Sequence, residues 1–242
     1  MPEAAEAINA FLSKMREGLG ARGRPNVATR WYAKRQHDDS FLRAPWCNMR
    51  VTWAAFHSGT HGAVCFGTDF AYTVAHAEAF RQRGRWTYGT DGIQSGDVIF
   101  FQWEGGRRST RLIDHVGVVE KVLSGGRVQT IEGNTSDALL RKVRSGSTIS
   151  GYGRPDWNRS GNLLVTLQKG DSGPLVLALQ KDLLKVGQEL PKWGADGDFG
   201  DETVAAVKAF QKSAGFTGSD LDGTVGPKTR AALDKALKAL KK

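Results

Sequence analysis

The chain has 242 residues, of which 40% are hydrophobic and 24% charged, and its net charge is +9. These values are ordinary for a folded globular protein and exclude collagen-like, coiled-coil and wholly disordered chains. Apolar runs such as residues 98–101 are far shorter than the roughly 18 residues of a membrane-spanning helix, so no membrane insertion is expected.

The charge is divided unevenly along the chain. Residues 1–160 hold 18 Arg and 4 Lys against 15 acids, a net of +7, whereas residues 161–242 hold 1 Arg and 11 Lys against 10 acids, a net of +2. This change predicts two domains, 1–158 and 166–242, joined by a linker over 159–165. A basic protein binds polyanions, either nucleic acid or an anionic cell wall. No nucleic-acid-binding motif is present, so we expect no nucleic-acid partner.

The N-terminal segment carries apolar residues at helical spacing. This pattern predicts an amphipathic helix over residues 3–19. The first residues are acidic where a secretion signal is basic, and no continuous apolar stretch follows, so no signal peptide is expected.

Cys47 is one of two cysteines, too few for a disulfide framework. Pro45 precedes it, and Val51 and Ala54 follow at helical spacing, which places Cys47 in the first turn of a helix. Free N–H groups and the helix dipole favour an anion there, so Cys47 is a candidate nucleophile. The alternative is a buried cysteine that packs as a small hydrophobe, as we expect for Cys65.

Three strands are predicted downstream, over residues 96–103, 115–122 and 127–134, with a four-residue hairpin loop between the last two. If Val122 opposes Arg127, the strand alternation gives His115, Glu132 and Asn134 one common face.

Gly117 would oppose Glu132 in this register. It offers no side chain, so the Glu132 carboxylate could reach the His115 imidazole diagonally. A slip of one residue would put the two groups on opposite faces.

A thiolate, an imidazole that transfers the proton and a carboxylate or amide that orients the imidazole form a nucleophilic machinery. The order Cys…His…Glu-x-Asn resembles the CHAP domain, a family of cysteine- and histidine-dependent amidohydrolases and peptidases on a papain-like α+β fold. The resemblance rests on residues 46–47, 96–101, 114–119 and 131–134. It implies Cys47 as nucleophile, His115 as base, Glu132 as orienting group and Asn134 as an auxiliary residue.

Two points of the family pattern differ here or stay open. Some members hold calcium with a run of Asp residues before the cysteine, but here the acids stop after Asp39, so we expect no metal and no cofactor. Trp31 and Tyr32 are both candidates to assist the oxyanion, and the backbone N–H of Cys47 is a third donor.

Two other clusters carry weaker signals. His57, His61 and Cys65 have metal-like spacing, but glycines between them would break the helix that a zinc site needs. Residues 107–111 contain three arginines near His115, which form either a solvated face or a contact with an anionic wall polymer.

The C-terminal part contains an internal repeat. Residues 196–207 align with residues 222–233 at an offset of 26, and each copy has an Asp-Gly turn, a second glycine and a helix. A further helix is predicted after Pro174. The loops lack the acids of an EF-hand, so we reject calcium here also.

The segment 167–240 resembles the three-helix peptidoglycan-binding domain of bacterial and phage cell-wall hydrolases. The matching stretches are residues 169–174, 179–180, 196–200, 209–211 and 222–227. The resemblance implies a non-catalytic anchor that binds peptidoglycan.

Together these features predict a papain-like α+β (CHAP) domain followed by a small all-α three-helix domain. The expected function is a bacteriolytic, phage endolysin-like hydrolase that cuts an amide bond in peptidoglycan, as an N-acetylmuramoyl-L-alanine amidase or a cross-bridge endopeptidase. We expect a monomer that stays in the host cytoplasm before lysis and then acts on peptidoglycan and associated anionic polymers of the cell wall. The alternatives are a non-catalytic wall-binding protein with a degenerate CHAP fold, a metal-dependent amidase and a bacterial autolysin.

Overall fold

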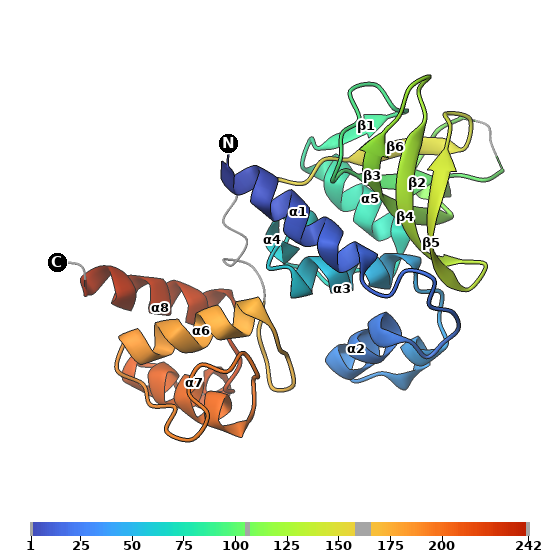
Figure 1. Ribbon diagram of the computed structural model, residues 1–242. Coiled ribbons are helices and arrows are strands. Elements are labelled where there is room, and N and C mark those ends of the chain that lie inside the picture. Colours follow the sequence, from blue (N-terminus) through green and yellow to red (C-terminus); the bar gives the residue numbers. More distant parts are fainter. Residues whose placement is uncertain (1, 105–106, 158–165, 241–242) are drawn as a thin grey trace. The chain divides into compact units, whose positions relative to one another are not determined.

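The structure is a computed structural model that describes residues 2–104, 107–157 and 166–240. The chain divides into two compact units, Met1–Arg159 and Ser160–Lys242. The first is an α+β unit and the second is all-α, which is the predicted fold class (Figure 1). The predicted linker, 159–165, lies outside the described residues.

The first unit is built on one antiparallel sheet of six strands, in the order β1-β6-β2-β3-β4-β5. The strands are β1 (Trp86–Tyr88), β2 (Val98–Phe101), β3 (His115–Val122), β4 (Val128–Thr135), β5 (Ala138–Arg144) and β6 (Ile149–Gly153). Two predicted features, the buried strand before His115 and the strand that begins at His115, are therefore found.

Helices α1, α3 and α5 gather on one side of this sheet (Figure 1). The helices of the unit are α1 (Pro2–Arg16), α2 (Val27–Gln36), α3 (Cys47–His57), α4 (His61–Val64) and α5 (Thr73–Gln82), with 3-10 turns at Asp39–Leu42 and Thr110–Leu112. None of the described helices is both long and apolar enough to span a membrane.

Helix α1 ends at Arg16, three residues before the predicted end at residue 19. Gly18 and Gly20 have φ angles of +76° and +90°, which end the helical conformation. The buried guanidinium of Arg50 donates to the carbonyl oxygens of Lys14 and Glu17, both at 2.5 Å. A cation at the C-terminal end of a helix stabilises its last carbonyls, so Arg50 fastens α1 to α3.

Both faces of the sheet are covered, as strand β2 shows. Val98 and Phe100 belong to the larger hydrophobic cluster, which includes residues of α1, α3 and α5. Ile99 and Phe101 point to the other face and pack with Val119 in a smaller cluster. The alternation follows from the two-residue period of a strand.

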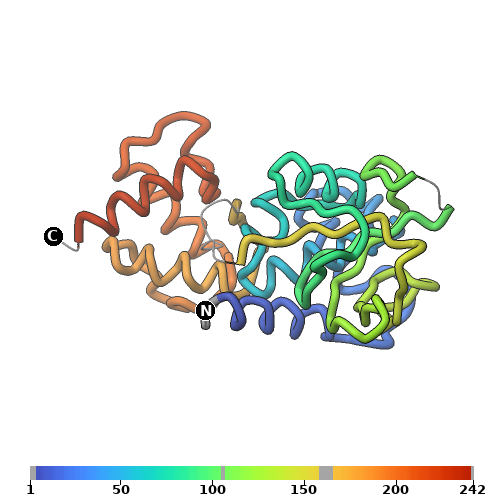
Figure 2. Tube along the Cα trace, turned by 90° about the horizontal axis from the view of Figure 1, so that it is seen from above, coloured from blue at the N-terminus to red at the C-terminus, as the bar shows by residue number. Residues whose placement is uncertain are grey.

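The second unit contains α6 (Pro174–Lys185), α7 (Asp201–Ser213) and α8 (Pro227–Ala239), with a 3-10 turn at Gly218–Asp220 (orange to red in Figure 2). The three helices match the prediction. Proline begins α6 and α8, where its missing N–H costs no helical hydrogen bond.

The internal repeat reappears as two matching hydrogen-bond networks. In the first, the side chain of Gln180 accepts from the N–H of Gly197 at 2.7 Å and lies 2.8 to 3.0 Å from acceptors on Asp196, Asp198 and Thr203. In the second, Gln211 makes the corresponding contacts at 3.0 to 3.1 Å. Its partners are Gly223, Asp222, Thr224 and Thr229. Each buried glutamine therefore ties the helix that carries it to one Asp-Gly loop.

Candidate active site

The start of α3 approaches strand β4 closely because Gly133 has no side chain. A Cβ atom at this position would lie 2.9 Å from Arg50 Cβ and 2.9 Å from the Trp46 ring. A glycine is therefore required where the two elements meet. Cys47 is the first residue of α3, so this packing brings Cys47 close to the sheet, where its thiol contacts the His115 imidazole.

His115 begins β3, and its Nε2 lies 3.1 Å from Oε2 of Glu132 on β4. Gly117 makes this possible, since a Cβ there would lie only 2.7 Å from Glu132 Cγ. The carboxylate crosses the space above a glycine to reach the imidazole, as the sequence predicts. Cys47, His115 and Glu132 are all buried, with exposed fractions of 6%, 7% and 0%.

The hairpin that brings these strands together differs from the predicted one. Val122 pairs with Val128 instead of Arg127, so the register at the loop is shifted by one residue. Glu120 is then an extra residue in β3, and beyond it Val119 pairs with Thr130. This β-bulge restores the register that brings Glu132 to Gly117.

Asn134 is not placed at the imidazole, which corrects the prediction of a shared face. Its φ angle is +62°, and the ladder between β4 and β5 shifts between Glu132 and Thr135. A bulge breaks the two-residue alternation, so Thr135 takes the position expected for Asn134. Thr135 Oγ1 lies 3.3 Å from His115 Nε2 and 3.1 Å from Glu132 Oε2.

Three further groups that were not predicted from the sequence surround the Glu132 carboxylate. Arg144 donates to both oxygens, from Nε to Oε1 at 2.8 Å and from Nη2 to Oε2 at 2.6 Å. Thr130 donates to Oε1 at 2.6 Å, and Thr135 is the third group. Burial opposes ionisation, but Arg144, His115 and Thr130 lower the pKa of the Glu132 carboxyl to about 2.

The His115 imidazole lies between a thiol and a carboxylate. Burial works against its charged form, but hydrogen bonds and charges from Cys47 and Glu132 outweigh burial and raise the pKa of His115 to about 9. Since Glu132 occupies Nε2, Nδ1 is the ring nitrogen left for the sulfur. An imidazolium beside the thiol is the arrangement that stabilises a thiolate.

A cavity of about 220 Å³ opens beside Cys47. It is lined mainly by apolar side chains, and Asp114 is its one acidic member. The lining residues are Phe41, Ala44, Pro45, Cys47, Met49, Ala71, Tyr72, Thr73 and Asp114. Cys47 therefore faces a space that can hold part of a substrate.

The side chains proposed to assist an oxyanion do not line this cavity. The Tyr32 hydroxyl donates to the backbone oxygen of Asp69 at 3.0 Å, and Trp31 packs against Phe56. The N-cap of α3, Trp46, has no side-chain hydrogen bond to the helix, so the first N–H groups of α3, that of Cys47 included, are not capped by a side chain.

The candidate zinc ligands have separate partners. His57 Nδ1 lies 2.8 Å from the Trp53 oxygen, and His61 Nε2 lies 2.9 Å from an oxygen of Asp69. Within residues 2–104, 107–157 and 166–240, no three His, Cys, Asp or Glu side chains are grouped so as to hold a metal ion.

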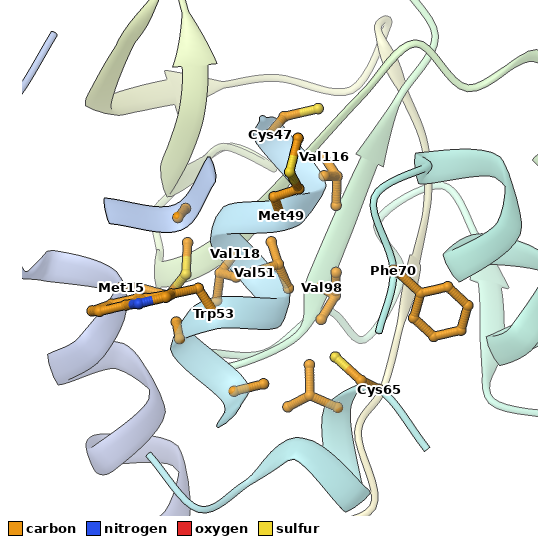
Figure 3. Close-up of a cluster of buried hydrophobic side chains, with 14 of the residues drawn as sticks. Met15, Cys47, Met49, Val51, Trp53, Cys65, Phe70, Val98, Val116 and Val118 are labelled. Carbon is orange, nitrogen blue, oxygen red and sulfur yellow. The ribbon is translucent and has the colours of Figure 1, made fainter. Parts of the chain in front are cut away.

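Cys65 lies in the same hydrophobic cluster as Cys47 but in another part of it (Figure 3). Figure 3 shows Cys47 at the first turn of α3 and Cys65 on the side of Phe70 and Val98. Cys65 is fully buried, and its sulfur lies 4.0 Å from the Thr52 hydroxyl. Burial raises the pKa of this thiol, so Cys65 is an inert core residue.

Comparison with protein families gives two matches. Residues 38–134 match the CHAP domain, and residues 172–233 match PG_binding_1, a peptidoglycan binding domain. The chain carries a CHAP domain followed by a peptidoglycan-binding domain. Both resemblances predicted from the motifs are thereby confirmed. Cys47, His115 and Glu132 all lie within the CHAP match, whereas Arg144 lies beyond its end.

Two curated proteins similar to this chain come from Bacillus licheniformis. The N-acetylmuramoyl-L-alanine amidase CwlL is 37% identical over 131 residues, and a probable N-acetylmuramoyl-L-alanine amidase is 36% identical over 137 residues. The matches cover 53% and 54% of this chain but only 35% and 36% of the relatives. The chain therefore spans about a third of the length of these relatives.

A solved structure of a peptidoglycan-binding protein from Clostridioides difficile, in complex with glutamine hydroxamate, is 23% identical to this chain. The match covers 50% of this chain and 60% of that one, at a TM-score of 0.26. This score is too low to bear on the fold.

Proposed function

We propose that the protein is a peptidoglycan hydrolase that cuts an amide bond with Cys47 as nucleophile, His115 as proton carrier and Glu132 as orienting group. The observation that carries the proposal is the chain of contacts from the Cys47 thiol through the His115 imidazole to the Glu132 carboxylate. Neither the fully buried Cys65 nor the separated histidines 57 and 61 offer such a chain.

The proposed reaction begins with the Cys47 sulfur attacking the carbonyl carbon of the scissile amide. The N–H of Cys47, at the start of α3, stabilises the negative oxygen of the tetrahedral intermediate. The charged His115 gives its proton to the leaving nitrogen, and the amine departs from a thioester. Neutral His115 then takes a proton from water, the hydroxide attacks the thioester, and the acid and free Cys47 are released.

The scissile bond that this proposal favours is the one between N-acetylmuramic acid and L-alanine, because both Bacillus relatives are named as amidases of that bond. A cross-bridge endopeptidase is the second candidate.

Mass spectrometry of digested, purified peptidoglycan separates the two candidates. Stem peptides released with a free N-terminal L-alanine support the amidase. Stem peptides that remain on the glycan while the cross-bridges are opened support the endopeptidase. A digest in which no amide bond is cut contradicts the proposed function.

The C-terminal unit is proposed to hold the enzyme on the wall, since residues 172–233 match a peptidoglycan-binding family. The basic N-terminal unit is proposed to add electrostatic attraction to the cell wall. Arg107 and Arg108 line an open cavity with Tyr88 and Ser147, which suits an anionic wall polymer. Such a contact weakens as salt rises, because exposed charges are screened over about 8 Å at physiological ionic strength.

We also propose that the protein acts as an endolysin. In this role the protein stays in the host cytoplasm until the membrane is opened, and then acts at the cell wall. Cells that express the protein should remain intact and lyse only after the membrane is permeabilised. Lysis at the same rate without permeabilisation would contradict this role.

A further inference from the structure

Arg144 fixes the plane of the carboxylate that contacts His115. It ends β5, and its guanidinium makes a two-point contact with Glu132, at 2.8 Å to Oε1 and 2.6 Å to Oε2. A planar guanidinium that binds both oxygens leaves the carboxylate one orientation. Oε2 is also the oxygen 3.1 Å from His115 Nε2, so the same contact directs that hydrogen bond.

Two stacked aromatic rings border this contact. Phe101 and Trp103 lie 5.1 Å apart at an interplanar angle of 8°, and the Arg144 guanidinium lies 5.4 and 4.9 Å from their centroids. The same rings lie 5.7 and 5.6 Å from the His115 ring. One aromatic pair therefore packs against both the guanidinium and the imidazole. The Arg144 side chain is 23% exposed, so the ion pair is largely withdrawn from water.

We propose that Arg144 is a positioning residue of the active site, which clamps both oxygens of Glu132 and thereby holds the His115 ring against Cys47. The inference deepens the proposed function. It rests on that function only where it gives this contact a role in catalysis. Residue 144 lies outside the segment 38–134 that matches the CHAP family, so the match does not assign it.

The charged groups at this point come from several elements. Cys47 comes from α3, His115 from β3 with Asp114 just before it, Glu132 from β4 and Arg144 from β5. Without the arginine, the buried carboxylate loses two charge-assisted hydrogen bonds. It can then rotate away or take up a proton, and the imidazolium loses the partner that balances its charge. The thiolate beside it is destabilised in turn.

Alkylation of Cys47 by iodoacetamide tests this inference directly, because only the thiolate reacts. The 242-residue chain is treated between pH 5 and pH 10, and the modified Cys47 peptide is quantified by mass spectrometry. The variants are Arg144→Met and Arg144→Lys. The fully buried Cys65 serves as an internal monitor of unfolding in the same samples.

Arg141→Met is the matched control. Arg141 lies on the same strand and makes the same kind of two-point contact with a buried carboxylate, that of Glu120, but this carboxylate does not contact the imidazole. Its removal should leave the pH profile of Cys47 alkylation unchanged. A profile that shifts equally in both arginine variants would overturn a specific role for Arg144.

Arg144→Met should lower the alkylation rate of Cys47 about tenfold or more at pH 6, the effect expected when a charge-assisted hydrogen bond that holds the Glu132–His115 pair is lost. The two rates should approach each other at the alkaline end of the range, where ordinary thiols also ionise. Arg144→Lys should recover part of the lost alkylation rate, because lysine keeps the positive charge but not the planar group that donates to both carboxylate oxygens. A profile of Arg144→Met that superimposes on the wild type, with Cys65 protected, would overturn the inference.

If Arg144→Met exposes Cys65, the lysine variant decides. A drop at pH 6 in Arg144→Lys supports the clamp, and identity with the wild type contradicts it. The assay needs no peptidoglycan. A shifted profile in a protein that cuts no wall amide would therefore leave the clamp standing while the proposed function falls.

Discussion

The two cysteines of the N-terminal unit belong to one hydrophobic cluster, yet only one of them has the surroundings of a nucleophile. Cys47 contacts the His115 imidazole and borders a cavity, while the sulfur of Cys65 lies 4.0 Å from the Thr52 hydroxyl, and burial together with the Asp69 carboxylate raises the pKa of its thiol. Both are buried, so burial alone does not separate them. What separates the two is the imidazole beside Cys47 and the carboxylate behind it, which is the arrangement that activates a cysteine in general.

Removing the imidazole is the strongest way to erase this difference. His115→Ala should reduce peptidoglycan hydrolysis by roughly 10⁴-fold, in the range seen when a member of a catalytic triad is lost. At pH 6, iodoacetamide should then modify Cys47 as slowly as it does an ordinary thiol. Turbidity loss of purified cell walls measures the first effect, and retained wall binding in a pull-down shows that the protein is folded. Hydrolysis within tenfold of the wild type would remove His115 from the mechanism.

Glu132→Gln should cost less than His115→Ala but still about 10²-fold or more, by comparison with other losses of orienting groups. The amide can hold the ring but cannot stabilise imidazolium. The structure adds a second cost, because an amide has one oxygen and Arg144 donates to two. The NH₂ group of the new glutamine must then face an N–H donor of Arg144, which is unfavourable.

Glu120→Gln is the control for Glu132→Gln. The Glu120 carboxylate is held by Arg16, Gln129 and Arg141, and these contacts join α1 to the sheet. This substitution should lower the melting temperature and leave the hydrolysis rate of the folded protein unchanged. Wild-type hydrolysis rates in Glu132→Gln would eliminate its orienting role.

The pH dependence of hydrolysis should reflect the ionisation of the His115–Glu132 pair. His115 has a pKa raised to about 9, so hydrolysis should decline as the pH rises through about 9 and the imidazolium is lost. The pair also contributes stability. The His115 part is fully present below its ordinary pKa of 6.5 and is lost as pH rises through about 9.

The Glu132 part of this stability is fully present above its ordinary pKa of 4.5 and is lost as pH falls toward about 2. Melting curves of the wild type and of His115→Ala between pH 5 and pH 10 test the His115 part of this stability. The difference between the two should shrink above pH 9, and a difference that grows with pH would contradict the assignment.

Cys65→Ser should have the smallest effect on hydrolysis. The new hydroxyl lies in a fully buried position, so the melting temperature should fall, because a buried polar group without a good partner costs roughly 1–3 kcal/mol. The hydrolysis rate of the folded fraction should stay within about twofold of the wild type. Loss of hydrolysis in a folded Cys65→Ser protein would mean that the wrong cysteine has been chosen.

The parts of the site that depend on local pattern could be predicted from the sequence. Helix α3 begins at Cys47, because proline before it and apolar spacing after it are local signals. Strand β3 begins at His115, because the valine-rich run that follows is a local signal for a strand. Helices α7 and α8 and the paired Asp-Gly loops of the second unit likewise follow from its internal repeat, and α6 follows from the proline at its start.

The meeting of His115 and Glu132 was predicted from a hairpin that is wrong by one residue at its loop. The bulge at Glu120 corrects the shift before the strands reach the site. Its carboxylate binds Arg16 and Arg141, which are distant in the sequence. A pattern of alternating residues carries no information about such contacts.

The remaining members of the site could not be found by alternation either. The backbone of Asn134, with φ of +62°, turns the strand so that Thr135 faces the imidazole. Arg144 lies opposite Val128 in the ladder, four pairs away from Leu140, the partner of Glu132, and its long side chain reaches the carboxylate. Three-dimensional packing decides both positions.

The central claim, that Cys47 is the nucleophile of a peptidoglycan hydrolase, is tested most directly by one measurement on purified peptidoglycan. Wild type, Cys47→Ala and Cys65→Ala are compared by mass spectrometry of the soluble products, after each protein is shown to bind cell walls. Our account predicts amide-cleavage products from the wild type and Cys65→Ala and none from Cys47→Ala. The same products from Cys47→Ala, or no such products from the wild type, would contradict it.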